Sequence, residues 1–291
     1  MEYIMLRKAL FTAIILVACG IVQNSRSAEI EKREEITETF TFKNTTGNTV
    51  VIDNIWGAIN VTGYSGSEVQ LKIIKTIKAN SEVLFAQAQK EVVLEITRAD
   101  SLLDLYVDTP SRHDRHKERR NQEWRNRNYD VRYDFTLHVP EQMTVELKTV
   151  LHGDIYLAKT SGDYIINNVN GGIKMEQMQG SGDVYAVNGN VEVDFSRNPR
   201  NDCRFGSLNG TVKLYFTPDL SADFSLKTFN GEIYTDFPVS ELPLQVIKNT
   251  EGETHKIYKV ERTTLVRVKD GGPEFSLDGF NGDMYIINKN K

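Results

Sequence analysis

The chain has 291 residues, enough for one large domain or two modest ones, and 40% of its residues are apolar while 26% are charged. This composition is typical of a folded protein and excludes wholesale disorder. The formal net charge of −5 at pH 7 argues against nucleic acid as the main partner, because nucleic-acid-binding domains are usually basic.

Residues 1–27 are predicted to be a signal peptide. Arg7 and Lys8 precede an apolar run from Leu10 to Ala18, which is too short to span a bilayer. Two processing sites compete: ordinary cleavage before Ala28, and lipidation of Cys19 at the end of a lipobox-like Leu-Val-Ala-Cys sequence. Both place the mature protein outside the cytoplasm, in the bacterial cell envelope, as a lipid-anchored, periplasmic or secreted protein.

Cysteine usage agrees with export. The chain has two cysteines, and Cys19 lies in the leader, so Cys203 has no partner for an internal disulfide. A catalytic thiol needs a basic neighbour that favours its thiolate form, and the sequence indicates none. We expect Cys203 to pack as a small hydrophobic side chain at a strand edge, and we predict no metal site and no cofactor.

Residues 28–140 are predicted to form an N-terminal β region with an antiparallel pattern, because apolar and polar residues alternate in short segments. One stretch breaks this pattern: Ser81 suits the N-cap of a short helix whose apolar residues have helical spacing. We expect this helix to cover a sheet face or an open end. The predicted strands are 36–42, 50–53, 59–61, 69–77, 92–97, 102–107 and 129–139.

Residues 111–128 form a basic insert without apolar periodicity, which is typical of a solvated loop between strands. On an acidic protein, such a patch could bind lipid phosphates, lipopolysaccharide or an acidic partner. The alternative is a solvated loop that binds nothing. The residues that would form this anionic-partner patch are Arg112, Arg115, Lys117, Arg119, Arg120, Trp124, Arg125 and Arg127.

Residues 141–291 are predicted to consist of glycine-cornered β-strand repeats. In each repeat, apolar residues stand two and four positions after a glycine that turns the chain. An insertion at about 238–270 interrupts them, and its segments 255–260 and 263–268 are expected to pair as a protruding hairpin. The corner glycines are Gly153, Gly162, Gly171, Gly182, Gly189, Gly210, Gly231 and Gly282, with an earlier copy at Gly57.

The clearest internal match pairs residues 223–234 (DFSLKTFNGEIY) with residues 274–285 (EFSLDGFNGDMY). A single repeat buries too few apolar side chains to offset the entropy lost on ordering it, so neighbouring repeats must stack. The predicted fold class is all-β: a β-solenoid, single-stranded and β-helix-like, preceded by the antiparallel region with its one short helix.

The stretch from Val131 to Asn288 resembles the bacterial adhesin-like β-strand-repeat proteins, a family of unknown function. An Asn-Gly or Ser-Gly corner, followed by Asp, Glu or Asn and then by alternating apolar residues, carries the resemblance. It implies an exported or envelope-associated β-solenoid without established enzymatic activity. The two insertions depart from the plain repeat, so the resemblance implies nothing about their roles.

The third position after the corner glycine is expected to face solvent. An exposed row of tyrosines there could stack on sugar rings or anchor a protein partner, because tyrosine has an apolar face and a polar tip. The alternative is that tyrosine simply suits a half-exposed strand. The tyrosines at this position are Tyr156, Tyr185, Tyr234 and Tyr285.

Carboxylates follow several corners. They could converge on calcium if the repeats stack in register, but local hydrogen bonding in turns is the favoured interpretation. The residues are Asp154, Asp163, Asp183, Glu232 and Asp283.

The sequence contains no Gly-x-Ser-x-Gly elbow, no His-Glu-x-x-His and no phosphate-binding loop, so we assign no catalytic residue. We predict a non-catalytic binding, adhesion or scaffold module whose partner is an envelope protein or a glycan. Membrane contact is expected through a possible lipid anchor, and no nucleic acid is expected. The alternative is a carbohydrate-active β-helix enzyme, a polysaccharide lyase or hydrolase, for which hydrolysis would need two carboxylates facing one glycosidic bond.

Overall fold

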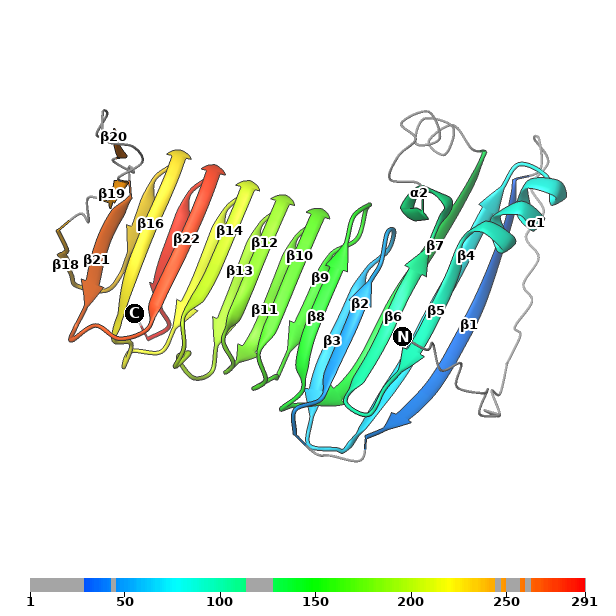
Figure 1. The fold of residues 1–291 in the computed structure, drawn as a ribbon, viewed down its shortest axis with the longest axis horizontal. Helices are drawn as coiled ribbons and strands as arrows, with labels where there is room; N and C mark the ends of the chain where they lie inside the picture. Colours follow the sequence, from blue (N-terminus) through cyan, green and yellow to red (C-terminus); the bar gives the residue numbers. More distant parts are fainter. Residues whose placement is uncertain are drawn as a thin grey trace.

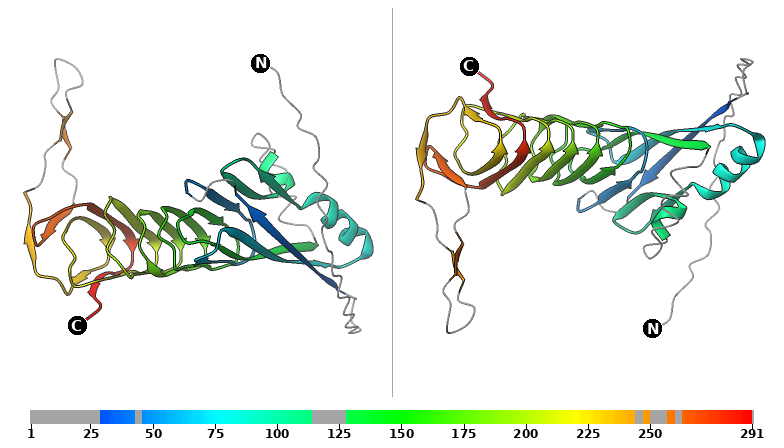
Figure 2. Two further views of the ribbon diagram at one scale, coloured as in Figure 1. Left: turned by 90° about the horizontal axis from the view of Figure 1, so that it is seen from below. Right: turned by 90° about the horizontal axis from the view of Figure 1, so that it is seen from above.

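A computed structural model describes residues 29–42, 46–113, 128–243, 247–249, 257–259 and 263–290. The predicted signal peptide with Cys19 lies outside these residues, and so do residues 114–127 of the basic insert. Within the described ranges, the molecule is predominantly β and contains two large mixed sheets, which face each other along an elongated body (Figures 1 and 2). The described helices include none with the length and apolar character needed to cross a membrane.

The ten-stranded sheet, sheet A, begins at one end of the molecule with long strands and continues with short ones. In order across the sheet, its strands are β1 (Ile30–Thr41), β4 (Glu68–Ala79), β7 (Tyr129–Pro140), β3 (Ile59–Tyr64), β9 (Ile155–Ala158), β11 (Ile173–Met178), β13 (Val191–Phe195), β15 (Val212–Phe216), β23 (Met284–Asn288) and β17 (Ile233–Thr235).

The eleven-stranded sheet, sheet B, lies opposite. In order, its strands are β18 (Val239–Glu241), β21 (Thr264–Val268), β16 (Ala222–Asn230), β22 (Glu274–Asn281), β14 (Cys203–Asn209), β12 (Gly182–Asn188), β10 (Tyr164–Asn170), β8 (Thr144–Thr149), β2 (Thr49–Asp53), β6 (Leu102–Asp108) and β5 (Val93–Arg98).

From β8 to β17, consecutive strands alternate between the sheets. Each strand from β10 to β15 pairs in parallel with the strand two positions earlier in the chain. We call a strand of sheet B and the following strand of sheet A a rung. The glycines between the strands of a rung, Gly153, Gly171, Gly189 and Gly210, are 18, 18 and 21 residues apart. Two other corner glycines lie at the start of sheet B strands instead: Gly162 shortly precedes β10, and Gly182 is the first residue of β12.

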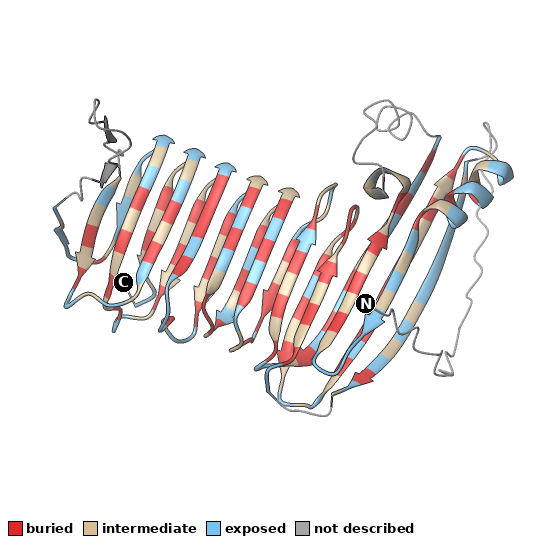
Figure 3. Ribbon diagram, in the orientation of Figure 1, coloured by how far each residue is buried: buried red, intermediate tan, exposed pale blue. Residues whose placement is uncertain are grey.

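The core lies between the two sheets, as the repeat pattern predicts. Ile155, Val184 and Val212 are at most 2% exposed, and Figure 3 shows buried and exposed positions alternating along the strands. Full burial of such side chains stabilises the fold by roughly 1.5–3 kcal/mol each. The pattern weakens only at the outermost rung, where Ile233 is half-buried and Thr235 is exposed.

A column of close backbone contacts explains the glycines between the strands of each rung. A Cβ atom on Gly171 would lie 2.2 Å from the carbonyl oxygen of Gly153, and one on Gly189 would lie 2.0 Å from that of Gly171. No side chain fits at such distances, so each rung can stack on the previous one only through glycine.

The N-terminal region contains all seven predicted strands, but its pairing is only partly antiparallel. β1, β4 and β7 are antiparallel neighbours, as are β5 and β6. β2 instead pairs in parallel with β6 and β8, and β3 pairs in parallel with β7 and β9. The prediction of an antiparallel region is therefore wrong in part, because an alternating pattern with a period of two residues is common to both kinds of sheet.

The predicted helix is confirmed as α1 (Glu82–Glu91). The side chain of Ser81 caps it by accepting a hydrogen bond from the backbone N–H of Leu84 at 3.3 Å. Phe85 and Ala88 are buried, and the helix contacts β4 and β7. It therefore covers the long strands at the β1 end of the molecule (Figure 1).

The C-terminal strands do not follow the order of the sequence. β22 lies between β14 and β16, and β23 lies between β15 and β17, with parallel pairing on both sides. The two matching sequences are thus direct neighbours in register: Phe224 is opposite Phe275, and Tyr234 is opposite Tyr285.

The insertion differs from the predicted hairpin. β20 (Ile257–Lys259) pairs with β19 (Ile247–Asn249), whereas β21 joins sheet B and pairs antiparallel with β16. Segments 255–260 and 263–268 are therefore not partners. Their alternation fits either pairing, and the apolar residues Val266 and Val268 of β21 are buried against the core.

Candidate functional site

The four predicted tyrosines do not form one row. Tyr156, Tyr234 and Tyr285 face outward from sheet A, whereas Tyr185 lies on β12 of sheet B. On sheet A, three other residues separate Tyr156 from Tyr285. The register order of this row is Tyr156, Lys174, Glu192, Lys213, Tyr285 and Tyr234.

Tyr234 and Tyr285 form the one stacked pair among these tyrosines. Their ring centroids are 5.0 Å apart and their planes differ by 13°. The Nζ atom of Lys213 lies 5.5 Å from the Tyr285 centroid, a cation–π contact. The hydroxyl of Tyr234 donates to the carboxylate of Glu232, which raises the pKa of Tyr234 to about 12. The hydroxyl of Tyr285 donates to the carboxylate of Asp283 at 3.3 Å, so the polar tips of this aromatic pair lie beside two carboxylates on the last two rungs.

Sheet B carries an apolar row that the sequence analysis missed. In each Asn-Gly corner between the strands of a rung, the residue before Asn is apolar and half-buried or exposed, and the register of its flanking residues places these side chains on neighbouring strands. Exposure of their side chains reaches 37% at Leu208, 44% at Phe280 and 70% at Phe229. Figure 3 shows the ends of β14, β22 and β16 as exposed, whereas Val169 on β10 and Val187 on β12 are half-buried. We call this set the corner row: Val169, Val187, Leu208, Phe280 and Phe229.

The end of the corner row is aromatic. Phe229 and Phe280 stack with centroids 4.9 Å apart and planes 5° apart. Tyr185 lies nearby on the same face, 39% exposed, and its ring covers Gly206, where a Cβ atom would lie 2.8 Å from the ring. The sequence signal for this surface was available: Val, Leu or Phe stands before every Asn-Gly corner of the repeats.

An amide ladder runs beside the corner row, one residue further along each strand. Asn188 donates to Asn170 at 2.9 Å, and Asn209 donates to Asn188 at 2.8 Å. Asn281 continues the ladder to Asn209 at 2.7 Å, and Asn230 donates to Asn281 at 3.0 Å. Each rung is therefore tied to the next by a side-chain bond as well as by the backbone. The amide ladder consists of Asn170, Asn188, Asn209, Asn281 and Asn230.

Three of the five corner carboxylates accept hydrogen bonds from backbone amides of the neighbouring rung, so these are not the local turn bonds that the sequence analysis favoured. Asp154 accepts from the N–H of Gly172 at 2.7 Å, and Asp283 accepts from that of Glu232 at 3.0 Å. Asp163 accepts from Ser181 at 3.3 Å. Each bond joins one rung to its neighbour. Among the described residues, no group of three or more His, Cys, Asp or Glu side chains is placed to hold a metal ion.

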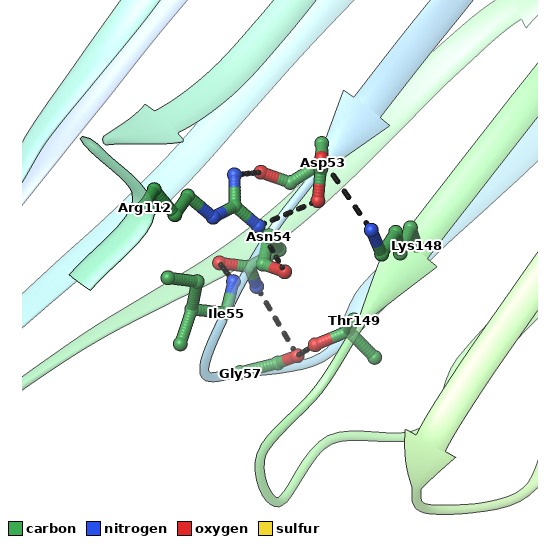
Figure 4. Close-up of polar contacts among 7 residues, drawn as sticks. All are labelled: Asp53, Asn54, Ile55, Gly57, Arg112, Lys148 and Thr149. Carbon is green, nitrogen blue, oxygen red and sulfur yellow. Dashed lines mark hydrogen bonds and ion pairs between the residues drawn. The ribbon is translucent and has the colours of Figure 1, made fainter. Parts of the chain in front are cut away.

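Arg112 is the one residue of the predicted basic patch that the structure describes, and it is bound within the protein. It belongs to α2 (Pro110–His113), and its guanidinium pairs with the Asp53 carboxylate at 2.6 Å (Figure 4). It also lies 4.5 Å from the centroid of the Tyr106 ring. Lys148 approaches Asp53 from the other side at 3.9 Å. Arg112 thus attaches the start of the insert to sheet B, and the remaining patch residues lie outside the described ranges.

The Asp53 carboxylate lies near a second one, Asp104, which bears on the alternative of a carbohydrate-active enzyme. Burial and the nearby Asp53 raise the pKa of Asp104 on the adjacent strand β6. Two neighbouring carboxylates with different pKa values can serve as the acid and the base in catalysis. Here Asp53 is engaged by Arg112 and Lys148, and Figure 4 shows these contacts meeting at the end of β2. This geometry favours a structural ion pair over a catalytic pair.

Cys203 is buried, 1% exposed, on the inner side of β14 at its first residue. Burial is the main cause that raises the pKa of its thiol to about 11. These surroundings fit the predicted packing role and keep the thiol protonated.

No protein-family model matches the chain, and no curated protein matches it significantly. Among solved structures, it is similar to a candidate cell adhesion protein from Clostridium sporogenes, with 14% identity, a TM-score of 0.46, and coverage of 89% of this chain and 100% of that chain. A candidate adhesin from Bacteroides fragilis has 13% identity and a TM-score of 0.38 over 88% and 97% of the two chains. A candidate lipid-binding protein from Parabacteroides distasonis has 12% identity and a TM-score of 0.24 over 87% and 96%.

Proposed function

We propose that the chain is an exported cell-envelope protein of the adhesin-like kind, whose stacked rungs form a β-solenoid that binds a partner without catalysis. One observation carries this proposal: the exposed aromatic pairs gather on the last two rungs, at the end of the molecule opposite β1 (Figure 1). With the signal peptide at the N-terminus, lipidation at Cys19 would tether the β1 end. The aromatic end would then point away from the membrane.

The elongated arrangement suits this role. Parallel rungs that repeat the same corner set the aromatic side chains at fixed intervals on a rigid support, which lowers the entropy cost of binding. Stacked aromatic rings with polar tips are suited to sugar rings and to protein hot spots alike.

Binding is tested with a variant that removes the sheet A pair, Tyr234→Ser with Tyr285→Ser, compared with Tyr156→Ser in the same outward row. Crosslinking in intact cells should capture a partner with the wild type and with Tyr156→Ser, and capture should fall with the double variant. Equal capture by all three proteins would exclude the tyrosine pair as the binding surface.

Anchoring is tested separately. Cells that express the full chain should incorporate radioactive palmitate into it, and Cys19→Ala should abolish incorporation. Incorporation that persists in the variant, or none in the wild type, would contradict lipidation at Cys19 and leave the ordinary cleavage before Ala28 as the processing route.

A further inference from the structure

We propose that the corner row and the amide ladder together bind a linear, uncharged polysaccharide chain that lies along the stacked rungs. This inference rests on the proposed function, because it names the ligand class of a binding module. It places the ligand on the sheet B corner, on a different face from the Tyr234–Tyr285 pair.

The apolar half of the surface is continuous. Neighbouring strands of a sheet are about 4.8 Å apart, so the five residues of the corner row span four strand spacings, about 19 Å. Leu208, Phe280 and Phe229 are the most exposed of them and lie on three adjacent strands. The C–H faces of pyranose rings pack on such aliphatic and aromatic side chains.

The polar half has unused hydrogen-bonding capacity. An amide side chain has two N–H donors and an oxygen that accepts two hydrogen bonds. Asn188, Asn209 and Asn281 each use one donor and one acceptor site within the ladder. Each is exposed and retains one N–H and one acceptor site. A sugar hydroxyl both donates and accepts, so it matches this remaining pair of sites.

The charges around the corner row favour an uncharged ligand. The nearest charged residues on the outer face, Lys227 and Asp278, are opposite each other on β16 and β22 and offset each other. Beyond the ladder, the corner carries Glu232 and Asp283, which would repel an anionic glycan or an anionic lipid surface. A neutral chain meets no such penalty.

The period of the surface also suits a polymer of sugars. Extended β-1,4-linked pyranose chains advance by about one strand spacing per sugar, so successive rings can meet successive rungs. Four to five sugars would occupy the corner row.

The experiment titrates the full-length mature protein with cello-oligosaccharides and chito-oligosaccharides of two to six sugars, using calorimetry. For at least one series, the dissociation constant should fall as the chain grows to four or five sugars and then level off. Phe229→Ser combined with Phe280→Ser should weaken binding by at least about tenfold. Leu208→Ser alone, on another strand, should weaken it by a smaller factor.

Val83→Ser is the control, because Val83 is 78% exposed on α1, at the other end of the molecule from both aromatic pairs, and its change should leave oligosaccharide binding unchanged. Melting temperatures of all variants establish that they fold. The proposal is overturned if neither series binds, if affinity does not depend on chain length, or if the Phe229 and Phe280 changes have no effect.

Two further results would separate this inference from the proposed function. A protein captured in cells through the corner row, in the absence of oligosaccharide binding, would make this face a protein interface and refute the glycan inference alone. If neither oligosaccharides nor any cellular partner depends on either aromatic pair, the proposed function fails as well.

Discussion

The side-chain amide of Asn230 donates to the amide oxygen of Asn281 at 3.0 Å, although 51 residues separate the two along the chain. The bond joins the two matching segments, residues 223–234 and 274–285, which lie side by side in the last two rungs. Because β22 and β23 are paired on both sides, the C-terminal segment belongs to the interior of both sheets. Its side chains should therefore matter for stability as core residues do.

The first prediction concerns Phe275. It is fully buried and stacks on Phe216 with centroids 5.4 Å apart, and it also contacts Phe224. Phe275→Ala should lower the free energy of unfolding by about 3–5 kcal/mol. Phe280→Ala, five residues later on the exposed corner row, is the control and should cost less than about 1 kcal/mol. Urea unfolding measures both, and equal losses would refute this placement of β22.

A pair of adjacent glycines tests the close stacking of rungs. A Cβ atom on Gly171 would lie 2.2 Å from the oxygen of Gly153, whereas one on Gly172 would meet nothing nearer than 3.6 Å. Gly171→Ala should therefore destabilise the fold by about 1–3 kcal/mol or more, and Gly172→Ala should be nearly neutral. Thermal melts compare them directly, and a similar melting temperature for the two variants would be inconsistent with the glycine column.

The amide ladder should behave as a coupled unit. Asn209→Ala removes the bonds to both Asn188 and Asn281, and we expect a loss of about 1 kcal/mol because the site is exposed. Adding Asn281→Ala should cost less than its effect alone, since their shared bond is already absent. A double-mutant cycle by urea unfolding measures this coupling. Strict additivity would show that the bond between Asn209 and Asn281 contributes nothing to stability.

The thiol of Cys203 should be inert in the folded protein. Because its pKa is raised from 9.0 to about 11, it remains protonated at pH 8 and iodoacetamide should modify it only after unfolding. The unfolded chain releases this proton at lower pH than the folded one. The buried thiol therefore makes its full contribution to the free energy of unfolding below about pH 9, and this contribution is lost as the pH rises to about 11.

Denaturant unfolding between pH 8 and pH 11 checks the second part, with Cys203→Ala as the control. The variant should show a shallower decline in stability over this window than the wild type. Identical declines, or rapid alkylation of the native protein at pH 8, would argue against a buried, protonated thiol.

The Arg112–Asp53 pair should contribute through more than charge. Both side chains are partly buried, at 15% and 26% exposure, and Arg112 also covers the Tyr106 ring. Arg112→Ala with Asp53→Asn should give a coupling energy of about 1 kcal/mol or more in a double-mutant cycle. Arg112→Lys should retain only part of this coupling energy, because lysine lacks the planar guanidinium group that pairs with Asp53 and stacks on the Tyr106 ring at the same time. If Arg112→Lys kept the full coupling energy, the contact would be a simple ion pair.

Much of the fold could be predicted from the sequence because its signals are local. Alternating apolar residues placed Ile155, Val184 and Val212 in the core, the corner glycines marked the turns, and Ser81 marked the helix start. The order of the final rungs could not be predicted. Residues 223–234 and 274–285 carry the same pattern, so either segment suits either position, and the order is seen only in the pairing of β22 with β14 and of β23 with β15.

The candidate site was harder to predict for a physical reason. The outward positions were identified correctly, but which of them become neighbours depends on the sheet that each strand joins, and this separated Tyr185 from the other tyrosines. Apolar residues were assigned to the core, so the exposed Leu208, Phe229 and Phe280 were overlooked. Arg112 looked like free positive charge because its partner Asp53 is 59 residues away.

The internal position of β22 and β23 also governs when the molecule can be completed during synthesis. A nascent chain that has emerged as far as Thr235 already contains β16 and β17, but their bridge to β14 and β15 consists of residues 274–288, which are translated after all four of these strands. The aromatic end can therefore be assembled only after β22 and β23 have been made. Premature termination between β17 and β22 would leave β16 and β17 without the strands that join them to the rest of the two sheets.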